Sequence, residues 1–180
     1  NELYDIGWYH SDRAALNRSY TLPALLREAQ KAHECGCGAL YLDPGWEFAE
    51  GTTFFDYHRL GDETELVKTL REQYGLSLAI RIILRTYVNY WPDALNAVHT
   101  PDGFASACML PRTIIPSKQL LYEQCLCNEP FRQEKERRAD KLAQDGAYFI
   151  MLDEMDWRGP CYHPGHGHAR PSTAYEHADA

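Results

Sequence analysis

The sequence predicts an α/β fold built on parallel strands. Apolar runs typical of strands alternate along the chain with segments whose apolar residues recur every three or four positions, as in helices. Such alternation implies parallel strands joined by right-handed helical crossovers. A polar or aromatic cluster also follows each predicted strand. With 180 residues, the chain is long enough to form one domain, residues 1–180, around its own hydrophobic core.

Composition excludes two classes of partner. The 18 Lys and Arg residues are outnumbered by 26 Asp and Glu residues, which gives a formal net charge of −8. A nucleic-acid-binding surface would be basic, so we expect no nucleic-acid partner. No apolar run reaches the roughly 18–20 residues that a membrane span requires, so we expect no membrane partner either. The charge suits a neutral or cationic ligand.

Two strands and a helix are predicted near the start of the chain. Residues Leu3–His10 are typical of a short strand that ends in aromatic side chains. The apolar residues of Leu22–Cys35 follow helical spacing, and two glycines can end this helix. Ala39–Leu42 is a compact apolar run, and the Pro and Gly of the segment Asp43–Trp46 indicate that a loop follows it.

The next helix has the clearest end signals. Asp62 suits its N-cap, Glu65 completes a capping box, and Gly75 suits the position just after its last turn. Leu76–Leu84 is then predicted to be a strand. Its two faces carry Leu78, Ile80, Ile82 and Leu84 on one side and Ser77, Ala79, Arg81 and Ile83 on the other.

The second half contains a long irregular stretch and two further helical segments. Residues Thr86–Pro116 are rich in proline and are expected to form a loop. Helical segments are expected over Ser117–Cys127 and Phe131–Gln144, followed by a strand over Ala147–Leu152. Another helix is expected to begin near Ser172.

Parallel strands bring their carboxyl ends to one edge, so the clusters that follow them should meet there. Doubly wound sheets and eight-stranded barrels both satisfy the predicted order, but no G-x-G-x-x-G fingerprint follows a strand. Active sites of barrels are built at this edge. A barrel needs about 250 residues. We therefore predict a partial (β/α)8 TIM-type barrel of about the first four β/α units, with a closed small sheet as the alternative.

Asp153 is the strongest candidate for a catalytic residue. It ends an apolar strand in phase with Phe149 and Met151, so a rigid backbone would hold its carboxylate. Nucleophiles and general acids or bases require such a group. Glu154 and Asp156 compete for the role, and capping of the following loop is the structural alternative for Asp153.

Aromatic and polar residues after the strands suggest a site for a carbohydrate substrate. An aromatic ring can stack on the C–H groups of a sugar while a nearby carboxylate accepts hydrogen bonds from paired hydroxyls. The alternatives are a turn at Asp43 with Trp46 packed on the surface, core packing for Trp8 and Trp157, and a structural salt bridge for Arg85. The residues expected to bind substrate are Trp8, Asp43, Trp46, Glu47, Arg85, Trp157 and His163.

Cysteine and histidine are concentrated near the C-terminal end of the sequence. The segment Cys161–His168 holds four groups able to bind zinc or copper, but its Pro and Gly residues indicate a loop without zinc-finger spacing. The pairs Cys35-x-Cys37 and Cys125-x-Cys127 are tighter than the usual zinc knuckle, and ordinary buried thiols explain them. We therefore expect no metal and no cofactor.

These motifs resemble the melibiase-type α-galactosidases, which form glycoside hydrolase family 36 and its clan D relatives. The resemblance is carried by Gly7-Trp8, the LDPGW motif at Leu42–Trp46, and Asp153 after the fourth strand, in an order and spacing that agree over most of the chain. The stretch Trp157–His168 also resembles a loop of this group. The resemblance implies a (β/α)8 barrel and a retaining mechanism, with Asp153 as nucleophile and with Asp43 and Trp8 binding the sugar.

The sequence departs from the family pattern at two positions. Pro44 occupies the position of a second sugar-binding aspartate, and Met151 that of a lysine two residues before the nucleophile. The acid/base of the family lies on the sixth strand, outside this chain. The expected function is a retaining glycoside hydrolase of α-galactosidase type. The alternatives are a non-catalytic carbohydrate-binding protein with a degenerate site, or a metal-binding domain that uses the loop Cys161–His168.

An open barrel half would leave apolar strand edges unpaired. Exposed edges recruit other strands. This predicts a homo-oligomer through the barrel edges, aggregation, or a position within a longer chain.

Overall fold

A computed structural model of the chain describes residues 13–43, 45–48, 51–83, 85–87, 101–102, 107–108, 121–153 and 160–173. The predicted strand Leu3–His10 and the helix expected to continue past Ser172 lie outside these ranges.

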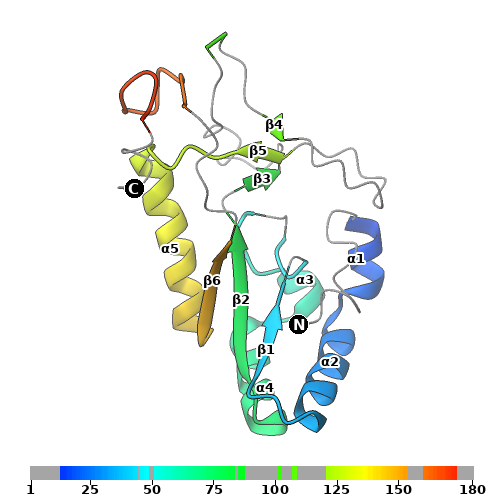
Figure 1. Cartoon of the computed structure of the whole chain (residues 1–180). Helices are drawn as coiled ribbons and strands as arrows, with labels where there is room; N and C mark the ends of the chain where they lie inside the picture. The colour runs from blue at the N-terminus through cyan, green and yellow to red at the C-terminus, as the bar shows by residue number, and fades with distance from the viewer. Residues whose placement is uncertain are drawn as a thin grey trace.

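A three-stranded parallel sheet forms the centre of the described fold. It consists of β1 (Ala39–Leu42), β2 (Ser77–Ile83) and β6 (Phe149–Asp153), in the order β1-β2-β6. Leu40 is in register with Leu78, and Ile80 with both Leu42 and Ile150. Figure 1 shows the three strands running in the same direction with helices beside them. The predicted α/β class with parallel strands is confirmed.

Three long helices cover one face of this sheet. They are α2 (Leu22–Glu34), α4 (Glu63–Tyr74) and α5 (Glu129–Asp145). Their apolar residues and one face of the strands form a single buried core. The members from the strands are Leu40, Leu42, Leu78, Ile80 and Ile82, and those from the helices include Ala24, Leu25, Ala29, Leu66, Val67, Leu70 and Leu142.

The N-cap and the C-terminal glycine predicted for helix α4 are confirmed. The side chain of Asp62 caps α4 by accepting hydrogen bonds from the backbone N–H groups of Thr64 and Glu65. Gly75 ends this helix in the left-handed conformation, at φ 65°. Gly146 ends α5 at φ 112°, and a Cβ there would lie 2.8 Å from Cγ1 of Val67, so the close packing of α5 on α4 also requires glycine.

A second, small sheet differs from the sequence prediction. Within the region expected to be irregular, β3 (Arg85–Tyr87) and β4 (Ala107–Cys108) are strands, and both pair antiparallel with β5 (Leu121–Glu123). The helix predicted over Ser117–Cys127 is therefore wrong. Pairing with two partner strands outweighs the helical propensity of this segment, as tertiary contacts commonly do.

Two short helices were not predicted. Helix α1 (Arg13–Ser19) precedes α2, and α3 (Tyr57–Leu60) lies in the connection between β1 and α4. Among the described residues, no helix combines the length and the apolar character needed to cross a bilayer.

The described part of the central sheet is open. Strands β1 and β6 are its edges in the ranges that the structure covers, and Tyr148, Phe149 and Leu152 of the β6 segment are exposed. A complete barrel remains a prediction.

Candidate active site

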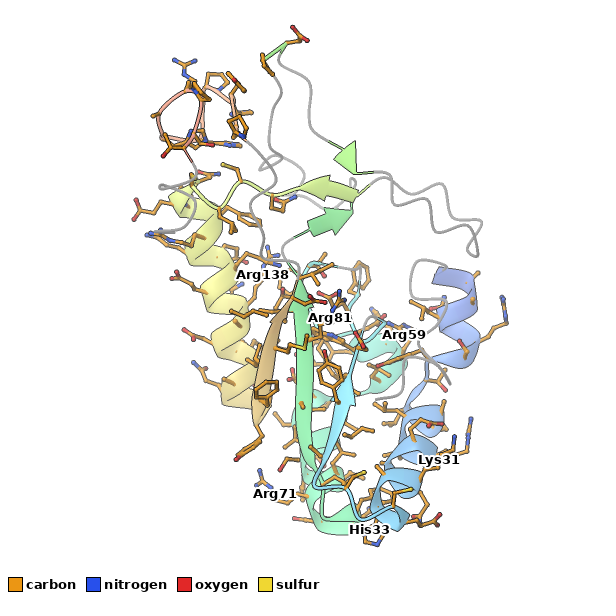
Figure 2. The ribbon with its side chains drawn as sticks, viewed as in Figure 1. Lys31, His33, Arg59, Arg71, Arg81 and Arg138 are labelled. Carbon is orange, nitrogen blue, oxygen red and sulfur yellow. The ribbon has the colours of Figure 1, made fainter. Side chains whose placement is uncertain are left out.

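Two carboxylates predicted from the sequence meet at the carboxyl end of the parallel sheet. Asp43 directly follows β1, and Asp153 is the last residue of β6. Arg81 of the central strand β2 lies between them. Its Nε atom is 2.6 Å from Oδ2 of Asp153 and 3.5 Å from Oδ1 of Asp43. Figure 2 shows Arg81 in the half of the sheet near these strand ends.

The trio formed by Asp43, Arg81 and Asp153 occupies the sheet face opposite the helices. Met151 is in register with Arg81, and Asp153 with Ile83. Residues in register point to the same side of a sheet, whereas Ile80 and Ile82 alternate with them and pack in the helix-covered core. In a (β/α)8 barrel, the face opposite the helices is the interior, and its carboxyl end is where active sites form.

The three side chains differ in solvent exposure: Arg81 is buried, whereas Asp153 is partly exposed. The side chain of Arg81 is 8% exposed, that of Asp43 14% and that of Asp153 38%. A guanidinium removed from water requires compensating negative charge, which the two aspartates supply. Asp153 is therefore both held by a charge-assisted hydrogen bond and accessible to a ligand.

A tyrosine and a methionine continue this face away from the strand ends. The Tyr41 hydroxyl donates to Sδ of Met151 at 2.9 Å. Met151 occupies the position where the melibiase resemblance places a lysine. Its register partner is Arg81, which carries a positive charge on this face.

Trp46, which we expected to stack on a sugar, belongs to the core. Its side chain is fully buried, and its indole N–H donates to the carbonyl oxygen of Arg81 at 2.9 Å. Its ring also packs against Phe55, with centroids 6.1 Å apart. A stacking platform needs an accessible ring face, so the structure corrects this prediction. The residue attaches the loop after β1 to strand β2.

Glu47 is also buried and organises its own loop. Its carboxylate accepts hydrogen bonds from the backbone N–H groups of Gly51 and Thr53, at 2.8 Å and 2.6 Å. Thr53 has φ 59°, an uncommon value for a β-branched residue. The predicted sugar-binding role of Glu47 therefore gives way to a structural one.

The buried side chain of Arg59 in α3 forms hydrogen bonds with the backbone of the same loop after β1. It is 9% exposed, and its Nε donates to Oδ2 of Asp56 at 2.7 Å. Its terminal nitrogens donate to the carbonyl oxygens of Tyr20, Gly45 and Glu47, at 2.9 Å, 2.6 Å and 3.0 Å. One buried guanidinium thus joins the end of α1 to the loop that begins at Asp43.

Helix α5 fixes the far side of this loop with two buried cations. Lys135 donates to the carbonyl oxygen of Gly51 and to Oγ1 of Thr53. Arg138 donates to the carbonyl oxygen of Thr52 at 2.8 Å and lies over the ring of Phe54, 4.2 Å from its centroid. Figure 2 shows Arg59 and Arg138 at the same end of the fold as Arg81. These contacts attach the segment 51–54 to α5.

Among the remaining predicted site residues, His163 is the one whose side chain the structure describes. Trp8 and Trp157 lie outside the described residues. Arg85 belongs to β3, where its backbone is in register with Glu123, and its side chain is not among those described. His163 stacks on His166 in the loop that follows β6, with ring centroids 3.9 Å apart.

Arg81 is the site residue that the sequence analysis missed. It is a charged side chain inside an apolar strand, where a buried cation requires a partner. That signal was present in the run LSLAIRIIL, but identifying the two partners required the register of β1 and β6.

A cavity of about 300 Å³ lies at the other end of the sheet, between α4 and α5. It is lined by residues that include Arg71, Ser77 and Tyr148. Because Ser77 begins β2 and Tyr148 precedes β6, this cavity is separate from the carboxylates at the strand ends.

Comparisons with known proteins show the fold and leave the family open. Neither a protein-family model nor a curated protein sequence matches the chain. Among solved structures, a xylosidase from Aspergillus niger matches 86% of this chain with a TM-score of 0.61 and 12% identity. A Flavobacterium johnsoniae GH31 dextranase matches 73% with a TM-score of 0.58 and 13% identity.

A third solved structure covers more of the chain. The α-N-acetylgalactosaminidase NagBb from Bifidobacterium bifidum matches 93% of it, with a TM-score of 0.58 and 21% identity. The chain spans 21%, 17% and 28% of the lengths of these three proteins, respectively. The fold of this chain is therefore similar to a part of each of these proteins, between 17% and 28% of its length.

Proposed function

We propose that this chain is the nucleophile-bearing part of a retaining α-glycosidase barrel, with Asp153 as the nucleophile. The observation that carries the proposal is the position of Asp153. It ends strand β6 on the face opposite the helices and is joined to Asp43 of another strand end through Arg81. The similarity to parts of three glycosidases supports the barrel.

The proposed reaction has two displacement steps. In the first, a carboxylate oxygen of Asp153 bonds to the anomeric carbon while the glycosidic C–O bond breaks, and an acid outside the described residues protonates the departing oxygen. In the second, water attacks the anomeric carbon and the ester bond to Asp153 breaks. The water loses its proton to the same acid/base, and the carboxylate is regenerated.

Arg81 is proposed to position the nucleophile. It binds Oδ2 of Asp153 and so fixes the orientation of the carboxylate that attacks the anomeric carbon. A fixed carboxylate orientation lowers the entropy cost of reaching the transition state. Arg81 would also replace the cation that the melibiase pattern places at Met151.

Asp43 is proposed to bind sugar hydroxyls beside the reacting carbon. Its side chain is partly exposed, and its loop is held by Trp46, Arg59 and the two cations of α5. A carboxylate on such a support can accept hydrogen bonds from two hydroxyls without reorganising.

The proposed substrate class is an α-linked glycoside of galacto configuration. The melibiase resemblance supports this choice, and the name of NagBb, an α-N-acetylgalactosaminidase, agrees with it. The xylosidase and dextranase similarities make α-xylosides and α-glucosides the comparison substrates.

Carbohydrate binding without hydrolysis is the second candidate, and one contact favours it. The 2.6 Å ion pair with Arg81 engages an Asp153 oxygen, as in a purely structural salt bridge. In that case sugars would bind at the strand ends and no glycosidic bond would break.

Kinetics of the full-length protein on aryl α-glycosides distinguish these candidates. The proposal predicts hydrolysis of an α-galactoside or α-N-acetylgalactosaminide, with a loss on the order of 10⁴-fold or more for Asp153→Asn. It also predicts that azide restores turnover of Asp153→Ala by forming a glycosyl azide. Glu154→Gln and Asp156→Asn serve as matched controls that retain activity. Saturable sugar binding with no turnover by the wild type would instead select the binding protein.

A further inference from the structure

Four metal-binding side chains from two distant segments meet beside the start of helix α5. Cys125 precedes that helix, and Cys161, His166 and His168 belong to the loop that follows β6. Each offers one ligand atom, and these four atoms all lie within 4.8 Å of one another. Figure 1 shows this loop beside the first turns of α5, at the end of the fold where the parallel strands finish.

The distances within the cluster suit a tetrahedral ion. Sγ of Cys125 lies 3.3 Å from Nε2 of His168, and Sγ of Cys161 lies 3.5 Å from Nδ1 of His166. Zinc binds sulfur at about 2.3 Å and nitrogen at about 2.0–2.1 Å, so its ligand atoms stand about 3.3–3.8 Å apart. Small side-chain shifts would complete the tetrahedron from the arrangement observed.

Groups around the cluster orient its members. Nδ1 of His168 lies 2.6 Å from the carbonyl oxygen of Ala169, which fixes the tautomer that leaves Nε2 as an electron-pair donor toward Cys125. The backbone N–H of His163 points at Sγ of Cys161, at 3.5 Å. Outer partners of this kind accompany metal-bound histidine and cysteine.

Two hydrogen bonds close the loop that carries Cys161, His166 and His168. The backbone N–H of Cys161 donates to Oγ of Ser172, and the backbone N–H of Ser172 donates to the carbonyl oxygen of Cys161. Gly167 has φ 77°, a conformation suited to glycine, and lies between the two histidines. This turn lets both rings approach the same point.

Burial separates these residues from the other cysteines of the chain. Cys125, Cys161 and His166 are 2%, 1% and 4% exposed, whereas Cys35 and Cys37 are exposed. Cys125 and Cys161 are not joined by a disulfide. His168 is half-buried, and the two thiols and two imidazoles together supply four donor atoms that one soft divalent ion would bind.

We propose that Cys125, Cys161, His166 and His168 bind one structural Zn²⁺ ion. The Cys2His2 set fills all four positions of a tetrahedral ion, which is the pattern of structural rather than catalytic zinc. On binding, each cysteine thiol releases its proton to solvent and binds as a thiolate. This departs from our sequence-based expectation of ordinary thiols and no metal.

The ion would connect the loops that follow the two carboxylates, by way of helix α5. It would tie the loop after Asp153 to the start of α5, and α5 holds the loop after Asp43 through Lys135 and Arg138. The proposal stands on the cluster alone and does not depend on glycosidase activity.

Metal content and thiol protection test the proposal together. The protein, purified under reducing conditions without metal-affinity resin, should retain about one equivalent of zinc by elemental analysis. Iodoacetamide labelling of the native wild-type protein, read by peptide mass spectrometry, should spare Cys125 and Cys161 and modify Cys35 and Cys37. Chelation should make the first pair reactive, and added zinc should protect it again. This readout needs no variant, so a folding defect cannot obscure it.

Variants and cobalt provide the second readout. Zinc content should fall at least tenfold in the Cys125→Ser and His166→Ala variants and stay unchanged in Cys35→Ser. Cobalt in place of zinc should give thiolate-to-metal charge-transfer absorption in the wild type that Cys161→Ser diminishes. Less than about 0.1 equivalent of zinc with no uptake on titration, or a Cys125–Cys161 disulfide in the native protein, would overturn the proposal.

Discussion

The Nε atom of Arg81 lies 2.6 Å from Oδ2 of Asp153, across the neighbouring strands β2 and β6. The same nitrogen is 3.5 Å from Oδ1 of Asp43. The distance between Oδ2 of Asp153 and Oδ1 of Asp43 therefore cannot exceed the sum of these two distances. This places them within the span of a single sugar ring, on the face that a barrel would enclose.

Removing the charge of Arg81 should impair turnover more than substrate binding. Without the guanidinium, the Asp153 carboxylate loses its fixed orientation, and misplacement of a reacting group by about 1 Å can cost about 10²-fold in rate. We expect Arg81→Ala to lower kcat by about this factor with little change in KM. Arg81→Lys should recover part of the loss, and free guanidinium ion should recover part of it in Arg81→Ala. Equal activity of Arg81→Ala and wild type would contradict the positioning role.

Asp43→Asn should weaken binding of the sugar itself. A hydrogen bond to a charged group contributes roughly 1.5–3 kcal/mol, so kcat/KM should fall about 10- to 100-fold. The loss should be the same for good and poor leaving groups, and a substrate that lacks the bound hydroxyl should show no further loss. If Asp43 were the acid/base instead, substrates with good leaving groups would be spared.

Arg59→Met should destabilise the protein, although the substituted side chain is buried and the solvent-exposed surface stays nearly the same. The substitution leaves the fully buried Asp56 without its 2.7 Å ion pair and removes the donors for three carbonyl oxygens. Loss of one partner of a buried pair costs about 3–5 kcal/mol. Urea unfolding should show a loss of this size, and the double variant Asp56→Asn/Arg59→Met should recover part of it. The exposed Lys31→Met is the control, with little change expected. Equal stabilities of Arg59→Met and Lys31→Met would show that the buried pair contributes nothing.

Glu63 should make stability depend on pH. It is 1% exposed in the first turn of α4, and burial, with Asp145 nearby, raises its pKa from 4.5 to about 8. Folding therefore favours the protonated carboxyl. The contribution is fully present below pH 4.5 and is lost as pH rises through about 8. Between these values the free energy of unfolding should fall with a slope of up to about 1.4 kcal/mol per pH unit.

The variant Glu63→Gln should remove this slope. It should match the wild type near pH 4.5 and exceed its stability by roughly 5 kcal/mol above pH 8. Glu65→Gln, an exposed change in the same turn, is the control and should leave the slope intact. Chemical denaturation at a series of pH values measures both, and parallel curves for wild type and Glu63→Gln would contradict this account.

The sequence predicted the parts of the fold whose signals are local. Asp62 and Gly75 mark the ends of α4 as predicted, and the two faces of Ser77–Ile83 divide as the alternation indicated. Asp43 and Asp153 were expected to meet because parallel strands end at one edge, and the structure brings them to a shared arginine. Their roles in catalysis remain predictions.

The parts that depend on distant pairing could not be predicted in this way. Strand β5 forms because β3 and β4 supply partners, although its own residues favour a helix. Trp46 follows the loop signal of Pro and Gly, and only the tertiary fold shows that its ring enters the core. The sequence indicated possible metal ligands in the loop Cys161–His168, but it could not show that Cys125, far back along the chain, joins them.

Covalent trapping tests the central claim most directly. The full-length protein would be incubated with a 5-fluoro-α-galactosyl fluoride, which forms the glycosyl-enzyme quickly and releases it slowly. Peptide mass spectrometry should then find one sugar attached through an ester to Asp153, with Glu154 and Asp156 unmodified. A label on another residue, or turnover of an α-galactoside to the inverted β-anomer without any label, would show that Asp153 is not the nucleophile.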